Sequence, residues 1–454
     1  MKMTTNNHIS LKPYLTKTKA AGSMVLLLLT LLFTVPATAQ SRTITLDEAI
    51  KLGLDNSKTL KLSQAKIDQA VSQYNQAKDE ALPTGSASFG YNRAQIPANK
   101  LNVGEEKLSL PTSANAYLGT LSLNQVIFAG NKLKYARQST DLLTRVSRLD
   151  AVNDRDQIAY NIIDAYYNLY KVLQGKKVVD QNLATIDAQI KQSQRFFDQG
   201  LVTKNDVLRF QLQRSNIELN GIDLENNRRI INYNMDVLLG LPENTELNIA
   251  QIVEAERSPA PLTAYLDTAM ANRPELRQLD LRKEVAETNI KSIQANTTPT
   301  LSASGSAYYV GISGNPIPKS GNFITPISLG VTAAWNFGTL WTNKNKVKEA
   351  RIQREQVLIS KDITTDNVKN EVNQSYQNYK AAVDKITLLQ TSINQAQENN
   401  RILESKYRSN ISSATDRADA QTLLYQAEIN LELAKADAGL AYYTLLKSTG
   451  KLNK

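Results

Sequence analysis

Apolar residues recur every three or four positions along two long stretches of the chain, a spacing typical of helices that pack in coiled-coil fashion. When the chain is slid against itself by about 210 residues, the apolar positions of one stretch fall on those of the other. The matched pairs are Ile158/Val368, Ile162/Val372, Tyr166/Tyr376, Leu169/Tyr379, Leu173/Val383, Val179/Leu389, Leu183/Ile393, Ile186/Ala396 and Phe197/Tyr407. Asp206/Asp416 and Gly240/Gly450 keep the same offset beyond the apolar stripes. The pattern predicts a chain built from two copies of one plan.

Proline and glycine are placed so that they leave room for long helices. Proline is absent from Thr112 to Leu241 and from Ile327 to Lys454, and the second tract also lacks glycine from Thr339 to Ala438. A proline inside a helix costs about 3 kcal/mol and a glycine about 1 kcal/mol. The tracts therefore predict long helices at about 131–240 in the first copy and about 340–449 in the second.

Two segments of each copy alternate apolar and polar residues, which predicts strands. They lie at about 85–93, 115–127, 300–312 and 324–337. Such alternation over about ten residues is typical of transmembrane β-barrel strands, although a half-buried sheet of a soluble protein has the same period. Serine and glycine are abundant on the polar face, and this favours a face that lines a water-filled lumen. The smallest membrane barrels need about eight strands and an open edge is costly in lipid, so several copies are expected to share one barrel.

The first 39 residues have the pattern of a secretory signal peptide. Four lysines precede an apolar run at 24–33, and Ala37-Thr38-Ala39 then supplies the small residues that a signal peptidase reads. Cleavage is predicted between Ala39 and Gln40. The apolar run is shorter than the roughly 20 residues that span a bilayer, so a retained anchor is the less favoured alternative.

Composition excludes most enzyme chemistry. The chain has no cysteine, and its one histidine, His8, falls in the predicted signal peptide. Histidine-dependent and cysteine-dependent nucleophiles, disulfides and nearly all zinc or copper sites are thereby excluded from the mature chain. An enzyme that uses carboxylates, lysine or tyrosine remains the least favoured alternative, and we expect no catalytic residue, metal or cofactor. The formal net charge is +10, but the bases are interspersed with acids along helical segments. Nucleic-acid binding is therefore not expected.

Several motifs resemble those of the outer membrane efflux proteins, the TolC-like family, over essentially all of residues 42–452. They are Leu46-Asp47-Glu48-Ala49-Ile50, Asn272-Arg273-Pro274-Glu275-Leu276, the strand-to-helix turn at 125–130 and the helix-to-helix turn at 197–207. The resemblance implies a mainly α fold with transmembrane β, a TolC-like α/β-barrel protomer. Each of two structural repeats would have a short helix, two β-strands and long antiparallel coiled-coil helices, with four strands per chain in a shared twelve-stranded barrel.

The repeats also predict the domain boundaries. The first repeat is expected at 40–241 and the second at 271–454, with a linker at 242–270 that the resemblance places at the equatorial level. Upstream of the strands the copies match at an offset of 216, which pairs Asn56-Ser57 with Asn272-Arg273.

The resemblance further implies a function. Such proteins are homotrimers in the bacterial outer membrane, in contact with its lipid, with a long periplasmic extension. They are passive exit ducts of tripartite efflux pumps or type I secretion systems, not enzymes. A periplasmic adaptor (membrane fusion) protein and an inner-membrane RND, ABC or MFS transporter would be the partners. The alternative is a periplasmic coiled-coil structural or adaptor protein without a membrane barrel, which the four alternating segments make less favoured.

The tips of the helix pairs are implied to form a periplasmic gate. Asp416 and Asp419 match acidic positions that point into the pore at its narrowest place, and Asp206 and Tyr407 match positions that help to hold family members closed. A ring of these carboxylates would attract cations. Alternatively, Asp416 and Asp419 are acids that the helix dipole favours at a helix N-terminus, and the two roles are compatible.

Gly200 and Asn410 fall at the two turns, where a positive φ is needed to reverse the chain. Many family members have glycine where this chain has Asn410, and a basic residue where it has Ser412. Elsewhere, Lys344, Lys346 and Lys348 form a basic cluster at the start of a predicted helix. We interpret this cluster as a solvated face, with a band near lipid headgroups as the alternative.

Overall fold

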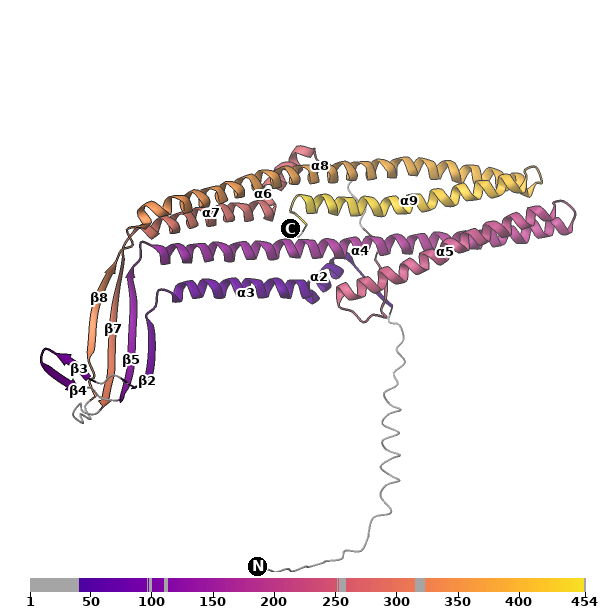
Figure 1. The fold of residues 1–454 in the computed structure, drawn as a ribbon. Coiled ribbons are helices and arrows are strands. Elements are labelled where there is room, and N and C mark those ends of the chain that lie inside the picture. Colours follow the sequence, from indigo (N-terminus) through magenta and orange to yellow (C-terminus); the bar gives the residue numbers. More distant parts are fainter. Residues whose placement is uncertain are drawn as a thin grey trace, which may run out of the picture.

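The computed structural model describes residues 41–95, 97, 100–109, 113–250, 252, 259–314 and 323–452. Within these ranges the chain forms a long rod of helices that carries a sheet at one end (Figure 1). The predicted signal peptide and its cleavage site lie outside the described residues. None of the helices in the described ranges combines the length and the apolar character needed to cross a bilayer.

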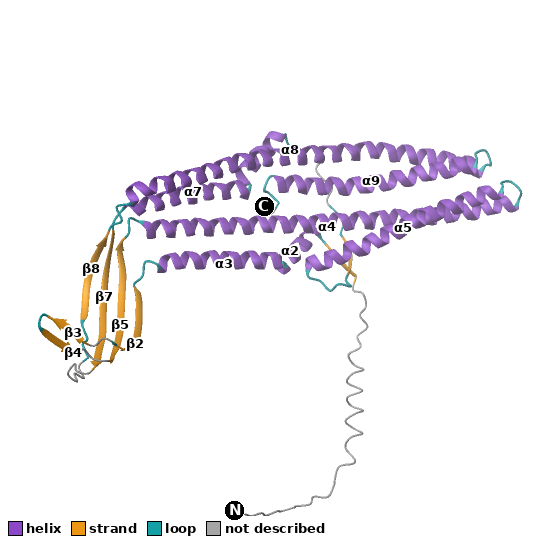
Figure 2. Cartoon of the chain, viewed as in Figure 1, coloured by secondary structure: helices purple, strands orange, loops and turns teal. Residues whose placement is uncertain are grey.

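Two long helical hairpins make up the rod. Helix α4 (Lys132–Asp198, 67 residues) pairs with α5 (Lys204–Leu239), and α8 (Thr339–Arg408, 70 residues) pairs with α9 (Ala414–Ser448). At 1.5 Å per residue, α4 is about 100 Å long. The hairpins run side by side, and both tips lie at the end of the rod that is far from the sheet (Figure 2).

Each repeat opens with two short helices where the sequence predicted one. They are α2 (Leu46–Asn56) and α3 (Lys58–Asp79) in the first repeat, and α6 (Leu262–Asn272) and α7 (Pro274–Gln294) in the second. The break falls at Ser57, with φ −63° and ψ 118°, and at Arg273, with φ −59° and ψ 121°. These extended backbone conformations interrupt the helix at equivalent positions, because proline follows Arg273 and Ser57 caps the next helix through its hydroxyl.

The ends of the hairpins lie on these breaks. Gly240 and Gly450 both adopt the left-handed region, with φ of 70° and 71°. A Cβ on Gly240 would lie 2.9 Å from the side chain of Asn56, and one on Gly450 would lie 3.1 Å from the backbone of Asn272. Glycine is therefore required at both positions for close approach as well as for φ. The two repeats that the sequence predicts are present in three dimensions.

The sheet is antiparallel, in the order β2-β5-β7-β8. Its strands are β2 (Thr84–Gln95), β5 (Ser113–Phe128), β7 (Thr300–Gly314) and β8 (Ile327–Ala334). A small hairpin, β3 (Lys100–Val103) with β4 (Glu106–Ser109), follows β2. The fourth strand is shorter than the predicted 324–337, because Ala334 already faces Thr300, the first residue of β7. Beyond its other end, Ile324 keeps only an isolated bridge to Val310.

The strand register places polar and apolar residues on opposite faces. Residues that are directly paired in the antiparallel sheet share a face, and neighbours along a strand alternate. One row across the sheet is Ser86–Ser122–Ser306–Ser328 and the next is Ala87–Leu121–Ala307–Ile327. The hydroxyl oxygens of Ser86 and Ser122 are 2.8 Å apart. One face of the sheet is thus hydroxyl-rich and the other apolar.

The predicted linker at 242–270 contains regular structure that the sequence did not indicate. Strand β6 (Glu246–Ile249) pairs in parallel with β1 (Ser41–Ile44), and most of α6 also lies within these residues. The Tyr166 hydroxyl of α4 donates to the carbonyl oxygens of Ile44 and Ala250, each at 3.3 Å. Four-residue strands are too short for their alternation to be distinguished from a loop, so the pattern did not predict them.

Candidate functional site

The two hairpin tips turn with the same geometry. Gly200 has φ 71° and Asn410 has φ 58°. At the first turn the N–H of Gly200 donates to Phe197 O and the N–H of Leu201 to Phe196 O, both at 2.9 Å. At the second turn Asn410 and Ile411 make the equivalent bonds, at 3.0 and 2.8 Å. Asparagine is among the few non-glycine residues that accept this conformation, and this explains why Asn410 substitutes for glycine at the second turn.

Asp206 and Asp416 both cap the helix that follows a tip. The Asp206 carboxylate accepts hydrogen bonds from the backbone N–H and the hydroxyl of Thr203, both at 2.8 Å. The Asp416 carboxylate accepts the same pair of bonds from Ser413, at 3.2 and 2.8 Å, and the Asp416 N–H donates to the Ser413 hydroxyl at 3.1 Å. These are capping boxes, which satisfy backbone groups that the first turn of a helix leaves free. Asp416 therefore has the structural role that the sequence left as an alternative.

Asp419 lies one turn after Asp416 and has a different environment. Both residues are exposed in the protomer. Among the described residues Asp419 makes no ion pair or side-chain hydrogen bond, so its carboxylate is free to face whatever lies beside the tip. Of these two acids, Asp416 stabilises the start of its helix, whereas Asp419 makes no stabilising side-chain interaction with the described residues of its own chain.

Tyr407 is buried between the two hairpins. Its side chain is 3% exposed, and its ring lies 5.8 Å from that of Phe196 on α4 and 5.9 Å from that of Phe210 on α5. Burial raises the pKa of Tyr407; the neighbouring Ser193 hydroxyl acts in the opposite direction, and the charge of Asp206 raises it further. The structure thus brings Tyr407 and Asp206 together, and Tyr407 fastens the second hairpin to the first.

Arg417 is a tip residue whose burial the sequence did not indicate. Its side chain is 4% exposed, it donates to Asn400, and it lies 3.8 Å from Glu404. Burial lowers the pKa of Arg417. From here a polar seam continues between the hairpins, where Gln421 donates to Asn182 at 2.8 Å. The signal in the sequence that could have revealed these polar contacts is that polar residues occupy positions of the helix–helix contact where the repeat otherwise has apolar residues.

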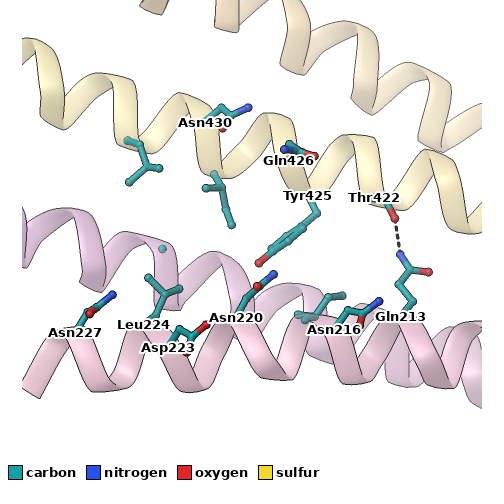
Figure 3. A pocket seen from close by; sticks show the side chains of 14 residues that line it. Gln213, Asn216, Asn220, Asp223, Leu224, Asn227, Thr422, Tyr425, Gln426 and Asn430 are labelled. Atoms are coloured by element: carbon teal, nitrogen blue, oxygen red, sulfur yellow. Dashed lines mark hydrogen bonds between the residues drawn. The ribbon is translucent and has the colours of Figure 1, made fainter.

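A groove of about 490 Å³ separates α5 from α9 above the tips (Figure 3). Most of its polar lining residues are amides, among them Gln213, Asn220 and Gln426, and Gln213 donates to the Thr422 hydroxyl at 3.0 Å. Tyr425 reaches from α9 towards α5. None of the predicted gate residues lines this groove. In the described part of the chain no group of three acidic or histidine side chains is arranged to hold a metal ion.

A family model described as outer membrane efflux protein matches residues 49–241 and 265–451. The chain belongs to this family. The two matched ranges correspond to the two repeats of the structure, and the resemblance inferred from the motifs is confirmed. Family membership assigns the chain to the outer membrane, with its helical rod extending into the periplasm, and to a class of channels that are not enzymes.

Individual relatives are distant but span most of the chain. The outer membrane efflux protein BepC of Brucella suis is 23% identical over 414 residues, which cover 90% of this chain and 86% of BepC. The outer membrane protein TolC of Escherichia coli is also 23% identical, over 87% of this chain and 80% of TolC. The solved CmeC outer membrane channel of Campylobacter jejuni has a TM-score of 0.73 at 16% identity, covering 98% of this chain and 94% of CmeC. The TolC-like protomer fold is therefore confirmed.

Proposed function

We propose that this chain is one subunit of a homotrimeric channel that serves as the passive exit duct of a tripartite efflux pump or a type I secretion system. The observation that carries the proposal is that the sheet of the protomer has two unpaired edge strands, β2 and β8, and that the outer helices below them carry exposed apolar residues. A closed ring of three copies would cover both features.

The open edges begin in the sheet. Strands β2 and β8 each pair on one side only, so β2 and β8 leave unpaired backbone groups at opposite edges. In a bilayer such groups cost several kcal/mol each, and a barrel removes the cost by pairing one edge with the other. The apolar row on one face and the serine row on the other suit lipid outside and water inside.

The same edges continue through the helices. Near the sheet, neighbouring helices touch in the order α3-α4-α7-α8. Near the tips α4 packs against α5 and α9, α9 packs against α8, and α5 also touches α9 across the groove. The edge below β2 is therefore formed by α3 and α5, and the edge below β8 by α8. A second copy placed beside the first would meet an α8 edge with an α3 and α5 edge.

Two of these edge helices, α5 and α8, carry exposed apolar stripes at coiled-coil spacing. The stripe of α5 consists of Leu208, Leu212, Leu219, Ile222, Ile230, Tyr233 and Val237. The stripe of α8 consists of Trp341, Ile352, Ile359, Ile363, Leu388 and Ile402. Exposed apolar rows of this length are unfavourable in water and are typical of surfaces that another helix covers.

The proposed number of copies is based on the number of strands that a water-filled barrel needs. The two edges differ, so copies join head to tail and close into a ring. Two copies would give eight strands, and the interior of an eight-stranded barrel is filled by side chains. Three copies give a twelve-stranded barrel with room for water. The duct would be opened at its tips by a periplasmic adaptor and an inner-membrane RND, ABC or MFS transporter, with Asp416 and Asp419 facing the pore and Asp206 and Tyr407 holding the tip.

The absence of cysteine makes a direct test of the ring possible. Thr84→Cys on β2 and Ala334→Cys on β8 lie at the helical end of the sheet. Across one protomer they are separated by three strand spacings, about 14 Å, and by a four-residue offset along the strands, about 13 Å. Bismaleimides of about 8–13 Å, applied to outer-membrane fractions, are expected to join neighbouring copies into a ladder that ends at three chains. Each single-cysteine variant is the control. A ladder that continues beyond three, or no band above the monomer, would contradict the trimer.

A further inference from the structure

A polar pocket lies where the sheet meets the helices. It has a volume of about 730 Å³ and is built from the starts of α4 and α8, the short 3-10 helix at Ala295–Thr297, and the ends of β7 and β8. Its lining contains two lysines, Lys132 and Lys346, and no acidic residue. None of the lining residues belongs to the proposed tip gate, which lies at the far end of the rod.

The two lysines are not neutralised by the protein. Within the described ranges neither Lys132 nor Lys346 forms an ion pair, and both are exposed to solvent. They come from helices that are far apart in sequence, yet they line one pocket. Two like charges held beside one space repel each other, and an anion between them relieves the repulsion.

The remaining lining residues can orient an oxyanion. The side-chain nitrogens of Asn296 and Asn336 donate to no described residue, and are therefore available as hydrogen-bond donors. In contrast, the hydroxyls of Thr298 and Thr339 already donate to backbone carbonyl oxygens, at 2.7 Å and at 2.6–3.0 Å. The pocket thus offers two cationic and two neutral donors, and the threonines hold the backbone that shapes it.

The register of the strands places the pocket on the serine-bearing face. Thr300 and Ala334 line the pocket and pair directly across β7 and β8. Alternate residues of a strand share a face, so Thr300 lies on the same face as Ser302, Ser304 and Ser306. This face is the one that the proposed function turns towards the water-filled pore.

We infer that this junction pocket binds the phosphate group of a dissolved solute, with Lys132 and Lys346 as its charged ligands. Lysine is a common point-charge ligand of phosphate, and the donors of Asn296 and Asn336 complete the coordination. The position of the site inside the pore rests on the proposed function, where three copies would form a basic belt at the entrance to the barrel. Solutes bearing phosphate would be retained there on their way out.

The test compares two pairs of lysines on the purified full-length protein in neutral detergent at low salt. Lys132→Gln with Lys346→Gln removes the pocket charges, whereas Lys344→Gln with Lys348→Gln removes the same net charge from the same region but not from the pocket lining. Titration with inorganic phosphate, followed by calorimetry, is expected to give saturable binding that weakens by about five- to tenfold in the first variant and by less than twofold in the second. Equal weakening in both variants, or no saturable binding to the unsubstituted protein, would overturn the inference.

Two further arms separate the possible failures. One arm measures binding to micelles doped with phosphatidylglycerol. If Lys132 and Lys346 are required for this binding but not for binding of inorganic phosphate, the ligand is a lipid headgroup and the assignment to a dissolved solute is wrong. Planar-bilayer conductance, measured on the same preparations, tests the channel independently. If the protein is trimeric and conducts ions but does not bind phosphate, only the phosphate site is refuted. If the protein binds phosphate but forms no pore, only the proposed function is refuted.

Discussion

Asp416 and Asp419 show how residues of one type, three positions apart, can have separable roles. Asp416 completes the capping box with Ser413, whereas Asp419 has no described partner in its own chain. A motif match alone assigns both residues to a gate, because the motif records the residue type and not the bonds that it makes. Only the hydrogen-bond geometry separates the residue that stabilises the helix from the residue whose charge remains free.

The separation predicts different outcomes for the two alanine variants. Asp416→Ala is expected to lower the free energy of unfolding by about 1 kcal/mol through the lost cap, and Asp419→Ala to leave it within about 0.5 kcal/mol of the original. Both variants should reduce the cation preference of the channel, because each removes a carboxylate from the tip. Thermal unfolding followed by circular dichroism and reversal potentials in planar bilayers measure the two effects. Unchanged ion selectivity in the double variant would remove both residues from the gate.

Asp236 gives the helical rod a pH-dependent stability. Its side chain is fully buried near the end of α5, where one carboxylate oxygen accepts from Asn232 at 3.0 Å and the other has no hydrogen-bond partner. Burial raises the pKa of Asp236 from 3.8 to about 6. A carboxyl that ionises at a higher pH in the folded state than in the unfolded state destabilises the fold above pH 6, and this cost disappears as the pH falls below about 4.

Asp236→Asn is therefore expected to stabilise the protein at high pH only. The amide oxygen can still accept from Asn232, and removal of the buried charge should raise the free energy of unfolding by about 1–2 kcal/mol at pH 8. At pH 4 the variant and the original chain should unfold at the same temperature. A matching substitution of an exposed acid, Asp223→Asn, should show no such difference. A gain that is equal at both pH values would indicate a packing effect and not a change in ionisation.

At the scale of elements, the sequence predicts what depends on long patterns and misses what depends on single bonds. The long helices follow from tracts without proline, and the strands from alternation, so both could be predicted. The break at Ser57 could not, because a capping hydroxyl at 3.2 Å from the Leu60 N–H leaves little trace in the periodicity. The β1–β6 pair and the burial of Arg417 likewise depend on residues distant in sequence meeting in space. Because the chain consists of two repeats, a feature recognised in one repeat could also be predicted in the other. Gly240 and Gly450, for example, mark equivalent ends of the two hairpins.

Gly240 and Gly200 predict that the addition of one methyl group lowers the stability by different amounts at the two positions. Gly240 and Gly200 have nearly the same φ, 70° and 71°, but a Cβ on Gly240 would collide with Asn56 whereas one on Gly200 would meet nothing within 4 Å. Gly200→Ala should cost about 1 kcal/mol from backbone strain alone, and Gly240→Ala about 3 kcal/mol from strain and overpacking. Chemical denaturation of the purified protein measures both. Equal costs would show that the hairpin end does not depend on close contact with the break between α2 and α3.

At the scale of the whole molecule, one protomer exposes apolar side chains and strand edges that a globular chain of this length would bury. The edge strands β2 and β8 and the apolar stripes of α5 and α8 lie along the borders of the protomer. Interior packing is found in clusters between the helices, such as the one around Tyr166 and the one near the tips that contains Phe210 and Tyr407. Under the proposed function, the protomer is one segment of a larger cylinder, and its stability depends on its neighbours.

The stripe of α5 predicts that assembly can be disrupted without unfolding the protomer. Leu219 and Tyr233 are 59% and 46% exposed, on the side of α5 opposite the buried Ile217 and Met235. Leu219→Glu with Tyr233→Glu would place charges in the helix–helix contact that the proposed function puts between copies, where burying each apolar side chain is worth about 1.5–3 kcal/mol, and would leave the buried Ile217 and Met235 in place. We expect the variant to run as a monomer in sedimentation velocity with its helical circular dichroism retained. Asn234→Glu, exposed on the same helix but outside the stripe, should remain trimeric. If the double variant also remains trimeric, α5 is not the border where copies meet, and the closed ring of three must be built from other surfaces.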